Sequence, residues 1–552
     1  GDIHQNEYVP ACYQRLKWLT GFTGSAGLAL VTQTQAFLFI DGRYTLQAPQ
    51  EVDGDLWTFK SFKRETIQDV IKENTLTSIH YDAWLMTVSE YDYWCSWGKR
   101  CNIQFHGLKH SLIDQLWTSR SPLPQHPIVE YPLCYAGESS LSKRQRLAQK
   151  IQQAQAQWAL FTKPESIAWL LNVRGQDIPT TPVFLSFAAL HHTGHVILWV
   201  DSSKVAFDRE DVTLYPYDPH HITTVFSEKT CVLIDPTATP VYLHDAFKEK
   251  GVDISFETDL TLLPKAIKNK TEQENALSIH IIDAVAIVRC LMWLEDTWPH
   301  TPLTELDVVK QLHTFRCESP LFKGDSFDTI AATGPHGAIV HYKPTTQTNR
   351  RLTEGDLFLL DSGGQYLGGT TDVTRTLPLG PTTLAQRQAF TRVLKGHIRL
   401  AQACFPTTTT GAQLDALARY DLWQEGQDYA HGTGHGVGNY LSVHEGPQSL
   451  SPLSKCTLHA GMILSNEPGY YEPHGFGIRI ENLMMVEKSV HKDFLVLKPL
   501  TQVPIDNRLV EKDMLTNNEI KWLQDYHKTI YDSLVVHNPT LGPFLTRHCF
   551  IY

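Results

Sequence analysis

The chain has 552 residues, 42% of them hydrophobic, and a formal net charge of −11. This length exceeds what one hydrophobic core normally supports, which predicts several domains, and the negative charge without a strong Lys/Arg run disfavours nucleic-acid binding. No apolar run reaches the length expected of a membrane span, and the start is unlike a signal peptide. The ten scattered cysteines without a CxxC pair are typical of reduced thiols in a cytoplasmic protein.

Two segments in the N-terminal half share an order of features. In residues 18–43 and 169–203, an aromatic-led helix end is followed by a Gly turn and an apolar hairpin that leads to Asp41 or Asp201. Chance similarity between two hairpins is the alternative to a weak internal repeat. The repeat predicts two related α/β modules in tandem, with residues 121–132 as a Pro-rich linker.

A long helix is predicted at the start of the third domain. Thr271 and Glu274 have the spacing of a capping box, and apolar residues follow at helical spacing. The apolar positions are 277, 281, 285, 288 and 292. Residues 515–534 form a second predicted amphipathic helix near the end of the chain. The expected domains are 1–126, 127–266 and 267–552.

A hairpin is predicted around two aspartates of the third domain. The apolar run LFLLD, residues 357–361, predicts a short strand, and the glycine-rich segment 363–369 predicts a turn. The β-branched segment 370–376 predicts the returning strand. This hairpin would bring Asp361 and Asp372 together.

Further candidate ligands follow in the sequence. His435 lies in HGTGHGVG, where the glycines make a helix unlikely and where neither the zinc motif HExxH nor a phosphate loop is complete. Glu467 follows the apolar run MILSN. In a strand over 477–481, the period of two places Arg479 and Glu481 on one face, so that the guanidinium can orient the carboxylate.

Four carboxylates that converge on one pocket would repel one another unless cations neutralised them. Two divalent ions would balance the four acids, an imidazole would complete the ligand set, and oxygen-rich ligation favours Mn²⁺ over zinc. The predicted metal ligands are Asp361, Asp372, His435, Glu467 and Glu481.

This ordered series resembles the pita-bread metallopeptidases, and within them the Xaa-Pro aminopeptidases (aminopeptidase P) in their long three-domain form. The motifs GPHGAIVHY, HGTGHGVGNYLSVHEGP and GYYEPHGFGIRIEN support the resemblance, as do HQNEYVP, GFTGSAG and DGRYTLQAP near the beginning. It implies an α/β (α+β) fold: two tandem creatinase-like N-terminal domains followed by a C-terminal pita-bread catalytic domain. It also implies that a first strand should precede Gly1.

The resemblance implies a metalloaminopeptidase that hydrolyses the N-terminal Xaa-Pro bond of short peptides by a hydroxide bridging two divalent metals. Mn²⁺ is the expected metal, with Zn²⁺ or Co²⁺ as alternatives. Asp372 and Glu481 would bridge the ions, Asp361 would hold one, and His435 and Glu467 would complete the other. The implied catalytic residues are Glu467, His341 and His444, and the implied substrate-binding residues are Arg43, His341, His431, His444 and Arg479.

Plainer interpretations stand beside these roles. The chain has 26 histidines, so any one of them is more often structural than catalytic, and Arg479 could be only an ion-pair partner. A prolidase shares the metal set, creatinase-like enzymes use the fold without metals, and a degenerate domain of this kind could bind peptides without catalysis. The resemblance further implies a homodimer, in which Trp423 is a conceivable contact with a buried core position as the alternative.

Overall fold

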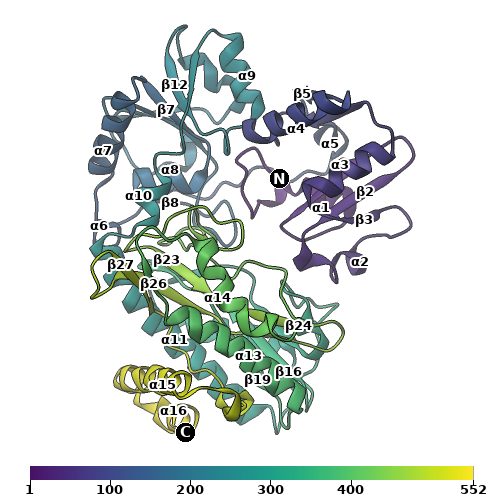
Figure 1. Cartoon of the computed structure of the whole chain (residues 1–552). Coiled ribbons are helices and arrows are strands. Elements are labelled where there is room, and N and C mark those ends of the chain that lie inside the picture. The colour runs from purple at the N-terminus through teal and green to yellow at the C-terminus, as the bar shows by residue number, and fades with distance from the viewer. Residues whose placement is uncertain (551–552) are drawn as a thin grey trace. The chain divides into compact units, whose positions relative to one another are not determined.

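The protein is described by a computed structural model of residues 1–550, shown as a ribbon in Figure 1. It folds into two compact units, Gly1–Lys265 and Ala266–Tyr552. The domain borders expected from the sequence, near residues 126 and 266, stay predictions.

The first part of unit 1 is built around a strand that is buried on both faces. Strand β2 (Ala36–Ile40) pairs antiparallel with β1 (Gly27–Val31) and parallel with β3 (Thr58–Ser61). Because side chains alternate along a strand, Leu38 and Ile40 join one hydrophobic cluster while Phe37 and Phe39 join another. The second cluster includes residues of α3 (Arg64–Glu73) and α4 (Val88–Cys101). Strands β4 (Ser78–Asp82) and β5 (Gln104–Leu108) form a separate parallel pair.

The second part of unit 1 is a six-stranded mixed sheet with the order β11-β10-β9-β7-β12-β13. Its strands are β7 (Trp158–Phe161), β9 (Phe187–His191), β10 (Val196–Trp199), β11 (Val212–Tyr215), β12 (Cys231–Ile234) and β13 (Asp253–Phe256). The neighbouring helices are α7 (Ser140–Gln153), α8 (Pro164–Leu171) and α9 (Val241–Glu249). Apolar side chains of the sheet and of α9 form one core cluster.

The two predicted hairpins are confirmed, each with the same local order of elements. Helix α1 (Arg15–Thr20) ends at a left-handed Gly21, and α8 ends at a left-handed Asn172. The antiparallel hairpins β1–β2 and β9–β10 follow. Each hairpin leads into a short 3₁₀ helix, capped by Asp41 in the first case and by Asp201 in the second. The internal repeat is therefore structural and not only a likeness of sequence.

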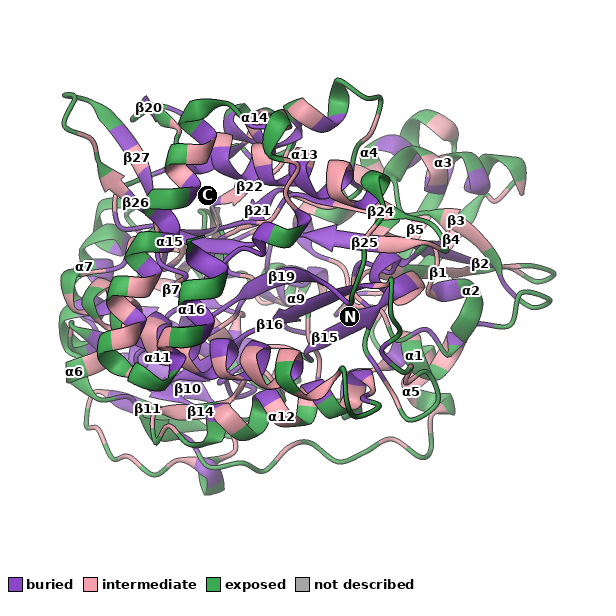
Figure 2. Ribbon diagram, turned by 90° about the horizontal axis from the view of Figure 1, so that it is seen from below, coloured by how far each residue is buried: buried purple, intermediate pink, exposed green. Residues whose placement is uncertain are grey.

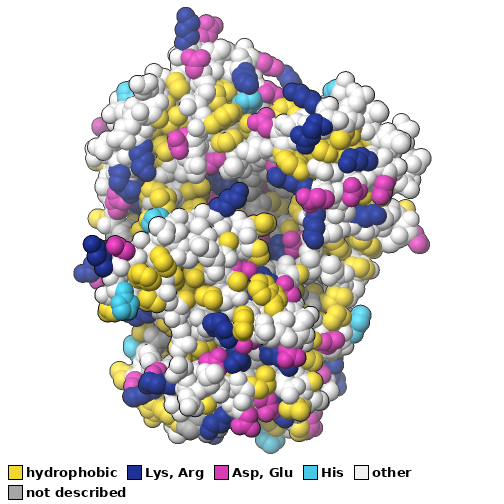
Figure 3. Space-filling model, viewed as in Figure 1, with side chains coloured by type: hydrophobic (Ala, Val, Ile, Leu, Met, Phe, Trp, Pro, Cys, Tyr) yellow, Lys and Arg dark blue, Asp and Glu magenta, His cyan; other side chains and the backbone are white. Residues whose placement is uncertain are grey.

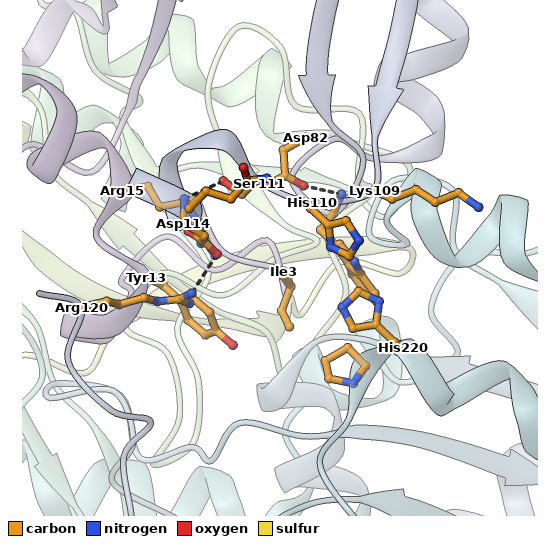
Figure 4. Close-up of a pocket in the computed structure, with 13 residues that line it drawn as sticks. Ile3, Tyr13, Arg15, Asp82, Lys109, His110, Ser111, Asp114, Arg120 and His220 are labelled. Atoms are coloured by element: carbon orange, nitrogen blue, oxygen red, sulfur yellow. Dashed lines mark hydrogen bonds and ion pairs between the residues drawn. The ribbon is translucent and has the colours of Figure 1, made fainter. Parts of the chain in front are cut away.

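A cavity of about 390 Å³, lined by both apolar and charged side chains, lies in unit 1 beside the carboxyl ends of β4 and β5 (Figure 4). Arg15 Nε donates to Asp114 Oδ1 at 2.6 Å, and Arg120 Nη1 donates to Asp114 Oδ2 at 2.7 Å. Both guanidinium groups also lie 5.1 Å from the centre of the Tyr13 ring. Since these cations already pair with a carboxylate of the same unit, we interpret the cluster as structural.

Unit 2 is built from short antiparallel sheets. Three have the orders β14-β17-β18, β15-β16-β19 and β20-β27-β26-β23. Their strands are β14 (Phe322–Asp325), β15 (Ile330–Thr333), β16 (Leu357–Ser362), β17 (Gly364–Tyr366), β18 (Gly369–Thr370), β19 (Val373–Pro378), β20 (Cys404–Pro406), β23 (Ile463–Asn466), β26 (Asn482–Lys488) and β27 (Phe494–Pro499). Two pairs complete the set: β21 (Gly434–His435) with β22 (Ser449–Leu450), and β24 (Gly469–Glu472) with β25 (Phe476–Arg479).

Helices pack against these sheets. They are α11 (Lys270–Thr297), α12 (Glu305–Cys317), α13 (Leu384–Ala401), α14 (Gly411–Trp423), α15 (Asn517–His537) and α16 (Gly542–Cys549). Strands β15, β16 and β19 are buried along their whole length, while the helices carry exposed residues (Figure 2). Apolar residues of β16, α11 and α13 share the largest core cluster.

Helix α11 begins earlier than the sequence predicted. Asn269 is the N-cap, and its side chain and that of Glu272 form the capping box, so the expected Thr271–Glu274 box is wrong by two residues. Asn269 is an equally good capping residue, and the box closes where the backbone enters the helix. The predicted helix 515–534 is confirmed as α15, which Thr516 and Glu519 cap.

The expectation that no apolar run is long enough for a membrane span also needs correction. By length and composition alone, α11 is long and apolar enough to cross a membrane, since an 18-residue window of it has a mean hydropathy of 1.8. More than half of that window, 56%, is buried inside the protein, and Asp283 within it pairs with Arg316 of α12. We therefore interpret α11 as a core helix. All ten cysteines, which lie within the described part of the chain, are free thiols.

Candidate metal centre

The two predicted aspartate ligands lie on one face of an antiparallel strand pair. Strands β16 and β19 pair antiparallel, as predicted, and the structure places Asp361 opposite Thr374 and Ser362 opposite Val373. Asp372 lies two residues before Thr374, so the two carboxylates are diagonal neighbours on the same face. The single turn predicted for 363–369 is wrong, because this segment contains β17 and the start of β18, which pair as a smaller hairpin.

His435 lies on the two-residue strand β21, and the absence of a helix over this segment is confirmed. The glycines of HGTGHGVG allow backbone to pack on backbone. A Cβ atom at Gly434 would lie 2.0 Å from Ser465 O, and one at Gly436 would lie 2.0 Å from Glu445 O. Nδ1 of His435 lies 3.0 Å from Gly436 O. This contact favours a proton on Nδ1 and leaves Nε2 to face the acids.

The side chains converge on one point. Nε2 of His435 lies 3.5 Å from Asp372 Oδ2 and 3.3 Å from Glu467 Oε1. One ligand atom each from Asp372, His435 and Glu481 lies within 4.8 Å of the other two. The exposed fraction is 7% for Asp361, 4% for Asp372 and 1% for Glu481. Because these carboxylates are almost completely buried, an unpaired negative charge on them would be strongly unfavourable in free energy.

Two carboxylate oxygens of the predicted ligands have no hydrogen-bond partner among the described residues. They are Oδ1 of Asp361 and Oε1 of Glu481, and both are buried. Buried polar atoms are normally satisfied, so orphaned acceptors in an acid-lined pocket fit positive ions, which supply what no protein donor does. The donor set of carboxylates and one imidazole suits divalent cations.

The pKa shifts show the same need for positive charge. Burial raises the pKa of Asp361 to about 7, against the opposing charge of Arg479. Burial and the charge of Asp372 raise the pKa of Glu481 well above its ordinary value. Burial raises the pKa of Glu467 as well, although His435 opposes the shift. Burial disfavours the His435 imidazolium, but the hydrogen bond to Asp372 and the charge of Glu467 outweigh it and raise the pKa to about 9.

Arg479 binds a different acid from the one expected. Its Nη2 donates to Asp361 Oδ2 at 2.6 Å, and its Nε donates to Thr374 Oγ1 at 3.2 Å. Thr374 Oγ1 in turn donates to Glu481 Oε2 at 2.7 Å. Arg479 thus reaches Glu481 through Thr374, and its direct carboxylate partner, Asp361, was not expected. Strand β25 ends at Arg479, so the strict alternation that predicted the pairing stops before residue 481.

His431 and His444 both lie close to Glu467. Nδ1 of His431 is 4.0 Å from Glu467 Oε2, and its Nε2 is 2.8 Å from Tyr471 Oη. The His444 ring is 4.3 Å from that of His435 and nearly perpendicular to it, and His444 also acts electrostatically on Glu467.

His341 and Arg43 complete the set of predicted residues. His341 follows a 3₁₀ turn that packs on β25, where a Cβ at Gly337 would lie 2.8 Å from Gly477 N. Arg43 lies in unit 1 and donates from Nε to Asp41 Oδ1 at 2.7 Å. The predicted contacts of His341 and Arg43 with substrate stay predictions.

Three supporting side chains were not predicted. Tyr471 Oη accepts from Arg479 Nη1 at 2.6 Å, and Ser465 Oγ donates to Glu467 Oε1 at 3.0 Å. Thr374 is the third. All three lie within two to four residues of a predicted ligand, inside the motifs SNEPGYY and TTDVTRT. Polar residues an even number of positions from a ligand in a strand lie on the same face as the ligand. This spacing is the feature of the sequence from which the three supporting side chains could have been predicted.

Comparison with family models gives the class of protein. Metallopeptidase family M24 matches residues 275–488, and the C-terminal region of peptidase M24 matches residues 493–542. Two models of the creatinase/prolidase N-terminal domain match residues 8–112 and 119–272. The fold and its acid-lined centre are therefore those of a metallopeptidase with two creatinase-type N-terminal domains.

Relatives over the full length define the family more closely. The chain is 39% identical to a probable Xaa-Pro aminopeptidase P of Laccaria bicolor, over 97% of this chain and 86% of the relative. It is 34% identical to aminopeptidase P1 of Arabidopsis thaliana, over 99% and 93%. The crystal structure of X-prolyl aminopeptidase from Caenorhabditis elegans superposes with a TM-score of 0.93 at 32% identity, covering 99% of this chain and 94% of that one. The chain belongs to the Xaa-Pro aminopeptidase (aminopeptidase P) family of M24 metallopeptidases.

Proposed function

We propose that this protein is a metal-dependent Xaa-Pro aminopeptidase that removes the first residue from short peptides with proline at the second position. The observation that carries the proposal is the convergence of Asp372, His435 and Glu481 in a chain that matches Xaa-Pro aminopeptidases over nearly its whole length. The C. elegans relative is described as a cytosolic enzyme with a di-nuclear active site.

We assign the two ions to the five predicted ligands. Asp361 would hold one ion, His435 and Glu467 would hold the other, and Asp372 and Glu481 would contact both. The orphaned oxygens of Asp361 and Glu481 support this assignment. Mn²⁺ is the metal we propose, because four of the five donors are carboxylates.

Two ions held by these residues would supply a polarised water molecule with its pKa lowered toward neutrality. Glu467 takes the proton of that water during attack on the scissile carbonyl and passes it to the proline nitrogen, which must be protonated to leave as an amine. Ser465 Oγ donates to Glu467 Oε1 at 3.0 Å and so fixes the direction of this base. His341 and His444 donate hydrogen bonds to the developing oxyanion.

Proline explains why a dedicated site is needed. A Xaa-Pro bond is a tertiary amide without an N–H, so a peptidase that grips extended backbone through that group loses a contact. We propose that His431 contributes to binding beside the centre, where Tyr471 orients its ring. We propose that Arg43 also contacts the peptide, while Arg479 acts on substrate only through Asp361 and Tyr471.

The decisive experiment combines metal analysis with a matched pair of substrates. Purified protein should contain up to two divalent ions per chain and should hydrolyse Xaa-Pro-Yaa peptides faster than the Xaa-Pro dipeptide. A strong preference for the dipeptide would instead identify a prolidase. Unchanged peptide binding in a protein that takes up no metal would identify a non-catalytic binding module.

We further propose that the protein is a cytoplasmic homodimer without a nucleic-acid partner. On the face that Figure 3 shows, acidic and basic side chains are interspersed, and the net charge is −11. Trp423 and Tyr420 of α14 are 45% and 46% exposed, so Trp423 is not a core residue and is free to serve as a subunit contact. Light scattering should give twice the mass of one chain, and a Trp423→Glu variant should scatter as a monomer.

A further inference from the structure

A buried ion pair lies behind the hairpin that carries the two aspartates. Asp283 of α11 accepts from Arg316 Nε of α12 at 2.8 Å. The side chains are 2% and 1% exposed, respectively. Neither residue belongs to the predicted ligand set, and breaking such a pair inside a protein is costly.

Arg316 binds the end of the first ligand strand. Its Nη1 donates to Ser362 Oγ and, at 3.1 Å, to Gly363 O. Ser362 directly follows Asp361, and successive side chains of a strand point to opposite faces. Arg316 therefore fixes the far side of the strand at the point where Asp361 faces the metal centre.

Asp283 binds the start of the second ligand strand. Its Oδ2 accepts from Thr371 Oγ1 at 2.7 Å, and its Oδ1 also accepts from Tyr366 Oη at 2.8 Å. Thr371 directly precedes Asp372, and its hydroxyl also accepts from Gly364 N at 2.9 Å. One ion pair thus spans the residues adjacent to both aspartates.

We propose that the Asp283–Arg316 pair is a positioning device that sets the spacing of Asp361 and Asp372 for two cations. The pair links α11 and α12 to both strands of the hairpin through Ser362, Gly363 and Thr371. Loss of a hydrogen bond that supports a metal ligand typically weakens metal binding by about 10- to 100-fold. The inference rests on the proposed metal centre.

The sharpest test removes one hydroxyl and keeps the shape of the side chain. The Thr371→Val variant lacks the hydroxyl that donates to Asp283, but the volume of the side chain is almost unchanged. The matched control is Thr391→Val. Thr391 is also fully buried, donates to Arg387 O at 2.8 Å and accepts from Glu511 N at 2.9 Å, in α13 and away from the centre.

The full-length protein, stripped with a chelator, would be titrated with Mn²⁺ alone by calorimetry. For Thr371→Val the dissociation constant of the Mn²⁺ sites should rise by about 10-fold or more, while the melting temperature of the apo protein falls no further than in Thr391→Val. The electron paramagnetic resonance signal of the coupled Mn²⁺ pair should change only in Thr371→Val. A second variant, Arg316→Lys, retains the charge but loses the forked geometry, and it should weaken Mn²⁺ binding in the same way.

Equal Mn²⁺ affinity in Thr371→Val, Thr391→Val and wild type would overturn the inference and leave the proposed function intact. Failure of the wild-type protein to bind Mn²⁺, Zn²⁺ or Co²⁺ would instead refute the metal centre itself. If Thr371→Val does not fold, Ser362→Ala provides the same comparison on the other strand.

Discussion

Arg479 connects more of the centre than any other single cation described here. It is 2% exposed, binds Asp361 and Tyr471 directly and reaches Glu481 through Thr374. One guanidinium partly offsets the charge of Asp361, yet the pKa of that carboxyl is still raised to about 7, because burial outweighs the ion pair. A single protein cation is therefore insufficient for four acids.

At this scale, Asp372→Asn should abolish metal-dependent turnover while leaving the fold intact. Asparagine has the same shape but no charge for two cations, so kcat should fall by more than about 100-fold and the bound metal should fall below two ions per chain. Element analysis and steady-state kinetics measure both. Asp525→Asn, an exposed acid on α15, is the control and should match wild type. Wild-type kcat in Asp372→Asn would refute the bridging role.

His444→Ala tests transition-state stabilisation. If His444 donates to the oxyanion, kcat should fall roughly 100-fold while KM changes by less than about threefold. Stopped assays over a range of Xaa-Pro-Yaa concentrations separate the two constants, with the exposed His491→Ala as control. A change confined to KM would make His444 a binding residue only.

The β16–β19 hairpin is the element on which the site depends. Gly363, just after Asp361, lies against Thr371 so closely that a Cβ atom would sit 2.0 Å from Thr371 O and 2.2 Å from Ser326 Oγ. No side chain can be accommodated without moving one of the two strands, since Thr371 O is backbone.

Gly363→Ala should therefore lower the free energy of unfolding by about 1–3 kcal/mol and weaken metal binding at the same time. Urea denaturation and Mn²⁺ titration measure the two effects. Gly542→Ala is the control, because Gly542 has helical backbone angles and nothing lies within 4 Å of a Cβ there. An unperturbed Gly363→Ala protein would mean that the hairpin is more compliant than its packing indicates.

A buried histidine of α15 makes stability depend on pH. Burial, assisted by the charge of Arg375, lowers the pKa of His527 to about 3, and its Nε2 accepts from Ile505 N at 3.1 Å. The unfolded chain takes up a proton near pH 6.5 and the folded one does not. Stability from this group is thus complete above about pH 6.5 and is lost as the pH falls toward 3.

His527→Gln retains an acceptor for Ile505 N but cannot titrate. Between pH 6 and pH 5, the unfolding free energy of wild type should fall by up to about 1.4 kcal/mol more than that of the variant. Urea denaturation at several pH values provides the comparison. If the unfolding free energies of the two proteins changed with pH in parallel, His527 would not take up a proton on unfolding.

At the scale of the whole molecule, metal binding and folding of unit 2 should be coupled. The predicted ligands lie in β16 and β21 or directly beside β19, β23 and β26, so ions that bind only the folded arrangement stabilise it by mass action. A chelator should lower the melting temperature by roughly 5–10 °C, and added Mn²⁺ should restore it. Coinciding melting curves with and without chelator would show that the folded protein does not bind these ions.

Local elements of this protein could be predicted from the amino-acid sequence. Apolar and β-branched runs predicted the strand pair around Asp361 and Asp372, and apolar runs after a Gly turn predicted the hairpins that lead to Asp41 and Asp201, because these depend on interactions between near neighbours. The same local signals missed the cap at Asn269, where two adjacent capping boxes compete and the remaining fold selects one.

Contacts between segments far apart in the sequence became known from the folded chain. That Arg479 binds Asp361, that Thr374 bridges to Glu481, and that Asp283 reaches Thr371 from α11 are contacts across 118, 107 and 88 positions, respectively. The helix or strand periodicity of a sequence does not predict such contacts, because each depends on how separate strands and helices pack. The charged residues of the site could be recognised in the sequence, but their hydrogen-bond partners could not. Burial decides those partners, because a charged group inside the protein can pair only with the few polar groups packed beside it.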